Sequence, residues 1–191
     1  MLDKPLPRRK FLKLGVLGGS SLIAASQIGC TKQSEPNHSL VQRKLLVLDG
    51  KESSIIVAIA EVILPSAKNF PSVEQALLVE RIDEELFFVS QSIQSDFKLA
   101  LSVVNTMPIL YGYFSFYTNL SKNERLLCFK ELQNTRFDSI RAASNAARMI
   151  INLVYFSHSS TWDLIGYDGT FAKVPEIMSE QRNYYKQLTK G

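Results

Sequence analysis

The sequence has few of the residues that bind metals or form disulfides. His38 and His158 are its only histidines, and Cys30 and Cys128 are its only cysteines. These four residues do not have the spacing of a Cys/His metal site, so we expect no metal centre of that type. If Cys30 carries a lipid, Cys128 has no partner for a disulfide within the chain. Cys128 lies in an apolar helical stretch, which predicts a small buried hydrophobic residue.

The short motifs of common cofactor sites and nucleophilic sites are missing as well. The chain has no Gly-x-Gly-x-x-Gly after a strand, no phosphate-binding glycine loop, no Gly-x-Ser-x-Gly turn and no Cys-x-x-Cys-His for haem attachment. We therefore expect no cofactor, no metal and no catalytic residue in this chain.

His158, Ser160 and Asp163 could be considered a hydrolytic set. Three such residues within six positions are common in loops, whereas catalytic groups usually converge from distant segments. We interpret them as a loop histidine and a capping aspartate.

An acidic cluster at 80–85 could be considered a carboxylate metal site. Metal sites in helical bundles need carboxylates that project inward from several facing helices, usually with histidine. Here one predicted helix supplies Glu80, Asp83, Glu84 and Glu85, together with Arg81, on what we predict to be its polar face. We expect this face to be a solvated surface.

Positive charge is concentrated at the start of the chain. Residues 1–29 contain five Lys or Arg and one Asp, and their net charge of +4 equals that of the whole chain. The residues from 30 on are thus formally neutral and suffice for one domain with one core. Nucleic-acid binding requires a basic footprint on the folded domain, so we do not expect it.

The basic start resembles the twin-arginine export signal of bacteria, whose pattern is Ser/Thr-Arg-Arg-x-Phe-Leu-Lys. Pro7 stands where Ser or Thr is usual, and an apolar run over 14–28 follows the pattern. A charged start, a short apolar middle and a small-residue end are the parts of a secretory signal, so we exclude 1–29 from the fold. The matching residues are Arg8, Arg9, Phe11, Leu12 and Lys13.

Two alternatives for this segment are less consistent with its residues. A membrane-spanning helix needs about 20 apolar residues, whereas the run over 14–28 is shorter and contains glycine, serine and glutamine. An ordinary buried helix is disfavoured because glycine is a poor helix former and the paired arginines would have no role.

Cys30 follows this segment in a context that resembles the end of a bacterial lipobox. There the signal is cut before a cysteine that receives a lipid, although Gln27 stands where leucine is usual. The residues after Cys30 are polar and lack apolar periodicity, as expected of a lipoprotein linker, so we predict a tether over 30–48. The alternative is that the signal is cut elsewhere and that Cys30 is incidental.

From 49 to 191 the pattern predicts an all-α fold, an irregular bundle of about five to six helices. Three sequence pairs have the spacing of capping boxes, namely Asp49 with Glu52, Ser72 with Gln75, and Ser121 with Glu124. Apolar residues then recur at helical intervals after each pair and again over 93–110 and 137–156. We expect Met107-Pro108 to kink or end its helix. We reject a strand at 111–117, since an isolated strand has no partner.

A loop rich in turn formers and aromatic residues is predicted after Ser157. Loops held on a rigid scaffold are common recognition sites. The last stretch, 175–191, is predicted to form one more helix that carries Tyr184 and Tyr185.

Several short motifs together resemble the small (gamma) subunit of membrane-bound gluconate 2-dehydrogenase and related sugar dehydrogenases, the gluconate 2-dehydrogenase subunit 3 family. Members of this family have a twin-arginine signal, a first helix that ends in Ile-Leu-Pro and a helix that contains Ile-Asp. They also have a Phe-x-x-Leu-Ser/Thr segment before a Glu-Arg helix, and a Gly-Tyr-x-Gly near the end. The matching segments are 60–65, Ile82-Asp83, 116–121 with Glu124-Arg125, and 166–169 after Trp162.

This resemblance implies a non-catalytic subunit that supports twin-arginine export, stability and anchoring of a large partner. The partner would be an FAD-dependent dehydrogenase of the glucose-methanol-choline type, and a cytochrome c subunit often completes such a complex. It also implies a periplasmic, membrane-tethered location. We expect the partner interface at Trp162, Gly166, Tyr167, Asp168 and Gly169, because aromatic residues on a loop are favoured anchors; alternatively, Trp162 packs across the end of the bundle.

Two other functions stay open from the sequence. The chain could be a self-standing, lipid-tethered helical module that binds another envelope protein. It could also be an enzyme whose site is too dispersed to recognise.

Overall fold

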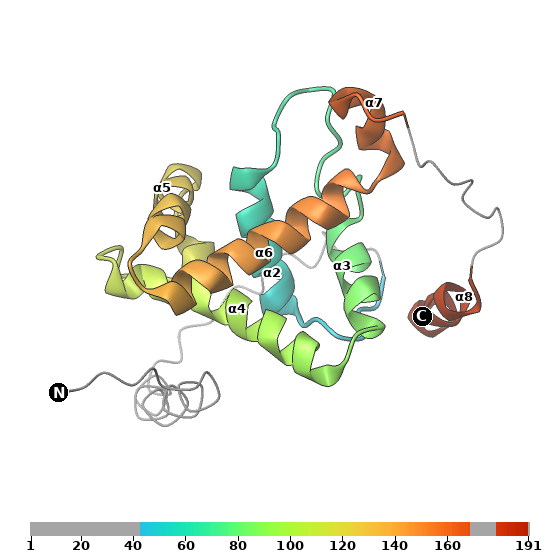
Figure 1. Cartoon of the computed structure of the whole chain (residues 1–191), viewed down its shortest axis with the longest axis horizontal. Helices are drawn as coiled ribbons and strands as arrows, with labels where there is room; N and C mark the ends of the chain where they lie inside the picture. The colour runs from blue at the N-terminus through green and yellow to red at the C-terminus, as the bar shows by residue number, and fades with distance from the viewer. Residues whose placement is uncertain (1–42, 169–178, 191) are drawn as a thin grey trace. The chain divides into compact units, whose positions relative to one another are not determined.

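The computed structural model describes residues 43–168 and 179–190. The predicted export-signal residues, Cys30 and Gly169 lie outside the described residues. Within them the chain is all-α, as predicted, with seven α-helices and two 3-10 helices and no strand (Figure 1). The helices are α2 (Gly50–Ile63), α3 (Leu78–Phe87), α4 (Gln91–Leu110), η2 (Tyr117–Asn119), α5 (Lys122–Asn134), α6 (Asp138–Phe156), η3 (Ser159–Thr161), α7 (Trp162–Ile165) and α8 (Glu180–Thr189).

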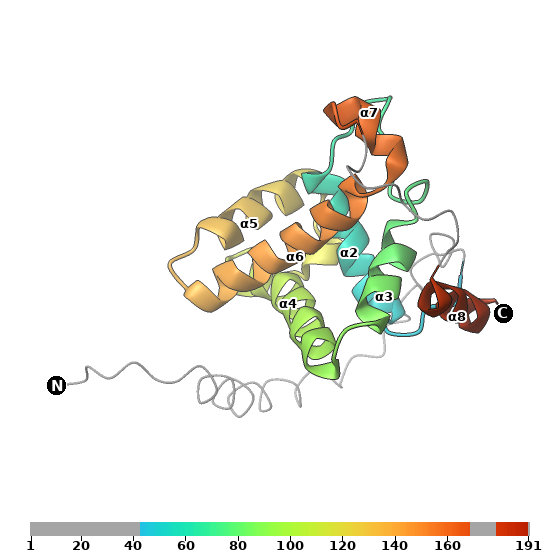
Figure 2. The ribbon, with the colours of Figure 1, turned by 45° about the vertical axis from the view of Figure 1, so that its right-hand side comes forward.

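Helix α6 lies at the centre of the bundle. It packs on α2, α3, α4 and α5, and Figures 1 and 2 both show it crossing α2 with α5 beside one half of its length. The core lies between these helices and contains the predicted inner faces. Its fully buried apolar residues include Ile56, Ile59, Ile82, Leu101, Val104, Phe129, Leu132 and Ile151. Cys128 is buried among them, as predicted, and burial raises the pKa of its thiol to about 12.

Two of the three predicted capping boxes begin helices. Asp49 with Glu52 opens α2, and Ser121 with Glu124 opens α5, each with both reciprocal hydrogen bonds. The third pair also forms its bonds, from Gln75 N to Ser72 Oγ at 3.2 Å and from Ser72 N to Gln75 Oε1 at 2.8 Å.

That third box does not begin an α-helix, so the predicted start of α3 is wrong. The residues after it form turns, and Leu77 adopts the left-handed conformation at φ 48°, so α3 begins only at Leu78. A left-handed residue cannot continue a right-handed helix. The expected end of α4 is close to the observed one, since the helix passes through Pro108 and ends at Leu110.

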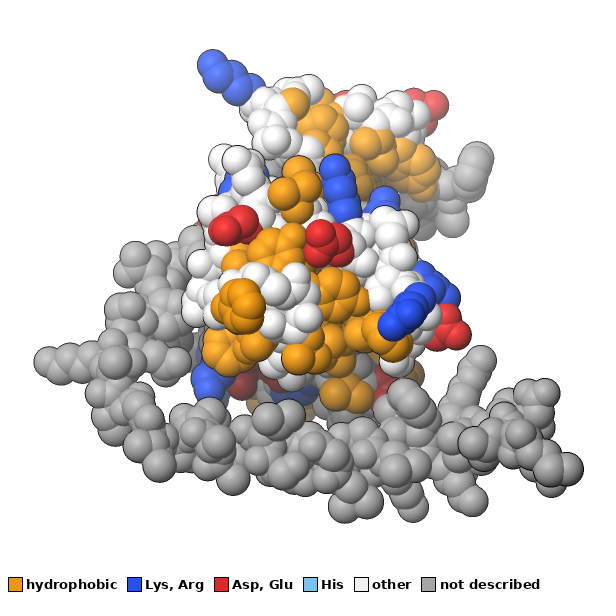
Figure 3. Space-filling model, turned by 90° about the vertical axis from the view of Figure 1, so that its left-hand side faces the viewer, with side chains coloured by type: hydrophobic (Ala, Val, Ile, Leu, Met, Phe, Trp, Pro, Cys, Tyr) orange, Lys and Arg blue, Asp and Glu red, His pale blue; other side chains and the backbone are white. Residues whose placement is uncertain are grey.

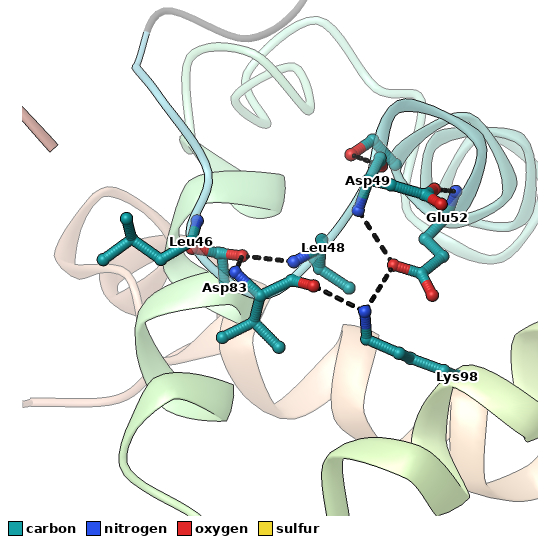
Figure 4. Close-up of polar contacts among 8 residues, drawn as sticks. Leu46, Leu48, Asp49, Glu52, Asp83 and Lys98 are labelled. Carbon is teal, nitrogen blue, oxygen red and sulfur yellow. Dashed lines mark hydrogen bonds and ion pairs between the residues drawn. The ribbon is translucent and has the colours of Figure 1, made fainter. Parts of the chain in front are cut away.

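The carboxylate of Asp83 joins three segments that are far apart in the sequence, namely α3, residues 46–48 and α8. Figure 4 shows its contacts with residues 46–48. Its Oδ1 accepts hydrogen bonds from the backbone N–H groups of Val47 at 2.9 Å and Leu48 at 2.7 Å. Its Oδ2 accepts from Leu46 N at 2.9 Å and from the hydroxyl of Tyr185 at 2.6 Å. All four bonds go to one side chain of α3, which therefore holds both residues 46–48 and helix α8.

Residues 46–48 are also held from the other side. The Lys98 Nζ on α4 donates to Val47 O at 2.5 Å and lies 3.1 Å from Glu52 Oε2 (Figure 4). Leu48 is buried in the core. The end of the segment predicted as a tether thus packs on the helical domain.

The expectation of a solvated acidic face on α3 is wrong for three of its carboxylates. Asp83 has no exposed surface, and Glu80 and Glu84 are only 5% and 8% exposed; Glu85 alone is exposed. Position 83 lies four residues after Val79 and three before Leu86, which places it on the inner face of the helix. The prediction of a solvated face rested on the polar character of these side chains and did not consider the position of Asp83 on the helix.

Helix α8 covers this face of α3, and it confirms the predicted C-terminal helix. Arg182 donates to Glu84 Oε1 at 3.0 Å and to Glu85 Oε1 at 2.8 Å. Tyr185 is 2% exposed and meets the ring of Phe87 edge-on with centroids 5.5 Å apart. Burial, followed by the hydrogen bond to Asp83 and the charge of that carboxylate, raises the pKa of Tyr185.

We predict that Asp83→Asn lowers the free energy of unfolding by about 2–4 kcal/mol, because the new amide keeps one acceptor oxygen while its NH2 group faces donors on the other side and leaves them unpaired. Denaturant unfolding followed by circular dichroism measures this change. Asp96→Asn on exposed α4 surface is the matched control and should change stability by less than about 0.5 kcal/mol. Equal effects of the two variants would contradict the role given to Asp83.

Candidate functional site

The predicted interface begins where α6 ends, and it is helical where a loop was expected. The chain turns through η3 into α7, so Trp162 is the first residue of a short α-helix. Thr161 is fully buried, and its hydroxyl donates toward the carbonyls of His158 at 2.7 Å and Phe156 at 3.2 Å. These bonds fix η3 to the end of α6, and α7 packs on η3.

Gly166 ends α7 in a Schellman motif. Its φ is +70°, a left-handed conformation that glycine adopts without strain. The N–H of Tyr167 donates to Trp162 O at 2.9 Å, and the N–H of Gly166 lies 3.4 Å from Asp163 O. The motif turns the chain back on the helix and brings Tyr167 beside Trp162.

The two aromatic side chains form one unit. The rings of Trp162 and Tyr167 meet edge-on at 90° with centroids 5.3 Å apart. Trp162 is half-buried, whereas Tyr167 is 38% and Ile165 47% exposed. The structure thus brings together three of the predicted interface residues, Trp162, Gly166 and Tyr167, and places exposed Asp168 directly after them.

His158 caps η3 rather than forming a hydrolytic set. Its Nδ1 accepts from Ser160 N at 3.3 Å and lies 2.6 Å from Ser160 Oγ. Burial, and then the charge of Arg81, lowers the pKa of His158. Asp163 lies in the first turn of α7 and makes no cap, so the predicted capping aspartate is wrong and the histidine holds the capping role.

The carboxylates of the acidic cluster serve structural contacts. Asp83 binds backbone N–H groups and Tyr185, while Glu84 and Glu85 bind Arg182. Over 43–168 and 179–190 there is no group of three or more His, Cys, Asp or Glu side chains arranged to hold a metal ion.

A cleft of ≈ 250 Å³ lies beside the C-terminal end of α2. Its charged lining residues are Glu61, Glu74 and Lys122. Glu61 binds Arg125 at 2.6 Å and Glu74 accepts from the Ser72 hydroxyl at 2.7 Å, so both carboxylates already have partners. This arrangement stabilises the turn after α2 and does not resemble a nucleophile with its base.

Two of the motifs that carry the family resemblance meet in the fold. Glu61, from the segment that ends α2, binds Arg125 of the Glu-Arg helix. Arg125 also donates from Nε to Leu120 O at 2.9 Å, and its own carbonyl accepts from the buried Tyr117 hydroxyl at 3.2 Å. These residues join α2, η2 and α5, and Ile82-Asp83 supplies the buried carboxylate described above. The motifs therefore mark contacts between helices.

A second exposed apolar surface was missed by sequence reasoning. It is here called the apolar tip and consists of exposed residues at the end of α4, in the connection between α4 and α5, and at the N-cap of α6. Hydrophobic side chains gather on this side of the molecule in Figure 3. Their exposed fractions are 40% for Ile109, 75% for Leu110, 87% for Phe114, 45% for Phe116 and 51% for Phe137. One sequence signal could have found it, since no charged residue occurs from Leu99 to Ser121.

Comparison of the chain with models of protein families, with curated proteins and with solved structures found no match. Among the described residues no helix has both the length and the hydropathy needed to cross a membrane.

We predict that Gly166→Ala destabilises the turn after α7 by about 1–2 kcal/mol, because alanine is strained at a left-handed φ. A Cβ at this position meets no atom within 4 Å, so the backbone conformation alone sets the cost. Hydrogen exchange at the Tyr167 amide should accelerate by roughly 5–30-fold. Gly166→Asn is the control and should accelerate it less, since asparagine tolerates this conformation better. Unchanged exchange in both variants would contradict the Schellman assignment.

Proposed function

We propose that this chain is the non-catalytic small subunit of a membrane-associated, FAD-dependent sugar or sugar-acid dehydrogenase of the glucose-methanol-choline type. In this role it supports twin-arginine export, stability and anchoring of the large subunit. Catalysis and FAD belong to that partner, a cytochrome c subunit completes the complex, and the whole assembly is periplasmic.

The observation that carries the proposal is the partly exposed aromatic pair of Trp162 and Tyr167. Tryptophan and tyrosine are enriched among the residues that dominate binding energy in protein interfaces. Here they are held by a short helix with a Schellman turn, at the end of a 19-residue helix that belongs to the core. A rigid support of this kind lowers the entropy cost of binding.

The N-terminal residues supply the rest of the proposed role. Arg8 and Arg9, with Phe11, Leu12 and Lys13, match the export pattern, and Cys30 follows as a candidate for lipidation. A chain with an export signal, a lipid and a partner-binding helix would direct an enzyme without its own signal to the cell envelope. Substrate specificity then lies in the partner and not in this chain.

A self-standing, lipid-tethered binding module is the alternative function. The apolar tip favours it to some extent, because this second apolar surface is suited to binding without any dehydrogenase. The neighbouring genes discriminate between the two proposals. A long flavoprotein with Gly-x-Gly-x-x-Gly near its start and no export signal of its own favours the subunit, and its absence favours the module.

The test is co-purification of the full chain with the flavoprotein encoded beside it. Replacing both Trp162 and Tyr167 by alanine should weaken the complex by about 2 kcal/mol or more, roughly 30-fold in Kd. Met149→Ala with Leu153→Ala is the matched control, because it removes two exposed apolar side chains from α6 and should leave the complex intact.

Undiminished association of the Trp162/Tyr167 variant, with normal helical content by circular dichroism, would contradict the interface. Turnover of sugar acids or polyols with a dye acceptor by the purified chain alone would contradict the non-catalytic role.

A further inference from the structure

The apolar tip, formed by Ile109, Leu110, Phe114, Phe116 and Phe137, is the largest feature that the proposed interface does not use. Four of the five residues lie in the uncharged stretch between Leu99 and Ser121. The fifth is brought close by a hydrogen bond from the Tyr111 hydroxyl to Thr135 Oγ1 at 2.6 Å, which joins the α4–α5 connection to the α5–α6 turn. Arg136 lies over the Phe137 ring at 5.1 Å from its centroid.

Polar groups of the connection form hydrogen bonds with the neighbouring helices and with the α5–α6 turn. The Tyr111 hydroxyl binds Thr135, and the Tyr113 hydroxyl lies 3.3 Å from Glu131 Oε2. Asn105 Oδ1 accepts from the backbone N–H of Thr118 at 3.2 Å and so ties the end of the connection to α4. Apolar side chains therefore face outward, while the polar groups stabilise the base.

The backbone holds Phe114 in a costly conformation. Its φ is +51°, which for a residue with a Cβ costs about 1–2 kcal/mol. This conformation does not bury the side chain, since Phe114 is the most exposed of the large apolar residues at 87%. Burial of the ring does not offset this strain, so we take the exposed Phe114 ring as a candidate contact for a second surface.

We propose that the apolar tip inserts into the interfacial region of a lipid bilayer. Shallow insertion suits a short connection with exposed phenylalanine and leucine, because aromatic residues partition to the membrane–water interface. The lack of charge over 99–121 means that this segment brings no ionised side chain of its own into the interface with Leu110, Phe114 and Phe116; the neighbouring Arg136 and Glu131 lie outside it. The predicted lipid on Cys30 favours a bilayer over a protein partner as the occupant.

The predicted lipid on Cys30 places the bilayer within reach. Twelve residues lie between Cys30 and Arg43, where the described chain begins, and the thirteen Cα-to-Cα steps span at most about 47 Å when extended. A tethered domain meets the membrane at a high effective concentration, so an insertion too weak to hold a free protein suffices. Tip and tether would then fix the orientation of the domain.

That orientation leaves the proposed partner interface free. The connection that carries the tip lies toward the N-terminal end of α6 and α7 follows its C-terminal end, as Figures 1 and 2 both show. The 19 residues of α6 separate the two surfaces by about 28 Å. The lipid and a protein partner can therefore be bound at the same time. This inference rests on the membrane location in the proposed function but not on the dehydrogenase partner.

Quenching by lipids with brominated acyl chains tests the insertion. The wild-type chain has one tryptophan, Trp162, which lies at the far end of α6 and serves as the first control. Phe114→Trp in a Trp162→Phe background places the only indole at the tip, and Leu110→Trp in the same background repeats the test at a second position. Leu153→Trp in that background is the matched control, since Leu153 is 67% exposed on α6 outside the tip.

Each purified full chain is reconstituted in phosphatidylcholine vesicles, with the N-terminal segment identical in all variants. We expect the tip indoles at 114 and 110 to be quenched at least threefold more strongly than those at 162 and 153, with blue-shifted emission. High salt should not reduce the quenching, because phosphatidylcholine has no net charge and the inserted segment 99–121 has no ionised side chain. Circular dichroism confirms that each variant is helical.

Equal quenching at all four positions, or no quenching at the tip, would overturn the proposal. In a separate sample, an indole at 114 whose fluorescence changes only when the flavoprotein is added would also overturn the proposal, because the tip would then bind a protein partner. The vesicles contain no dehydrogenase, so failure of the proposed complex leaves this result unchanged.

Discussion

The buried carboxylate of Asp83 is the interaction on which the arrangement of the helices most depends. One side chain accepts three backbone N–H groups from residues 46–48 and the hydroxyl of Tyr185. A buried carboxylate is tolerated only when hydrogen bonds replace those it made with water. Moving residues 46–48 or α8 away from α3 would leave the Asp83 carboxylate without these bonds, and this energetic cost holds the segments together. The two ends of the described chain therefore meet on α3. Helix α6, which packs on α2, α3, α4 and α5, forms the axis of the bundle.

The two ends of that axis differ in what they present to solvent. At one end, α7 displays Trp162 and Tyr167 on a helical turn fixed by Thr161 and Gly166. At the other, the apolar tip displays Phe114 and Leu110 without any nearby charge in the sequence. Large apolar groups exposed in two separate places indicate two binding events. We propose that the first binds a protein partner and the second lipid, as expected of a subunit that links an enzyme to a membrane.

Much of the fold follows from the sequence because periodic apolar residues and capping boxes are local signals. They predicted the all-α class, the inner faces of the helices and the starts of α2 and α5. Predictions failed where particular side-chain bonds decide, some of them tertiary and some local. Asp83 is buried because residues 46–48 and α8 supply donors that no local pattern reveals. The segment after Ser157 is helical because Thr161 and His158 form bonds that favour a turn, and Phe114 is exposed through a backbone conformation that periodicity does not describe.

The central claim, that this chain carries a partner enzyme to the cell envelope, is tested most directly by where that enzyme is found. Arg8→Lys with Arg9→Lys in the full chain removes the twin-arginine pattern and leaves the net charge and the helical domain unchanged. After fractionation, the neighbouring flavoprotein should be lost from the periplasm and retained, with this chain, in the cytoplasm. A flavoprotein that still reaches the periplasm in normal amount would contradict the account.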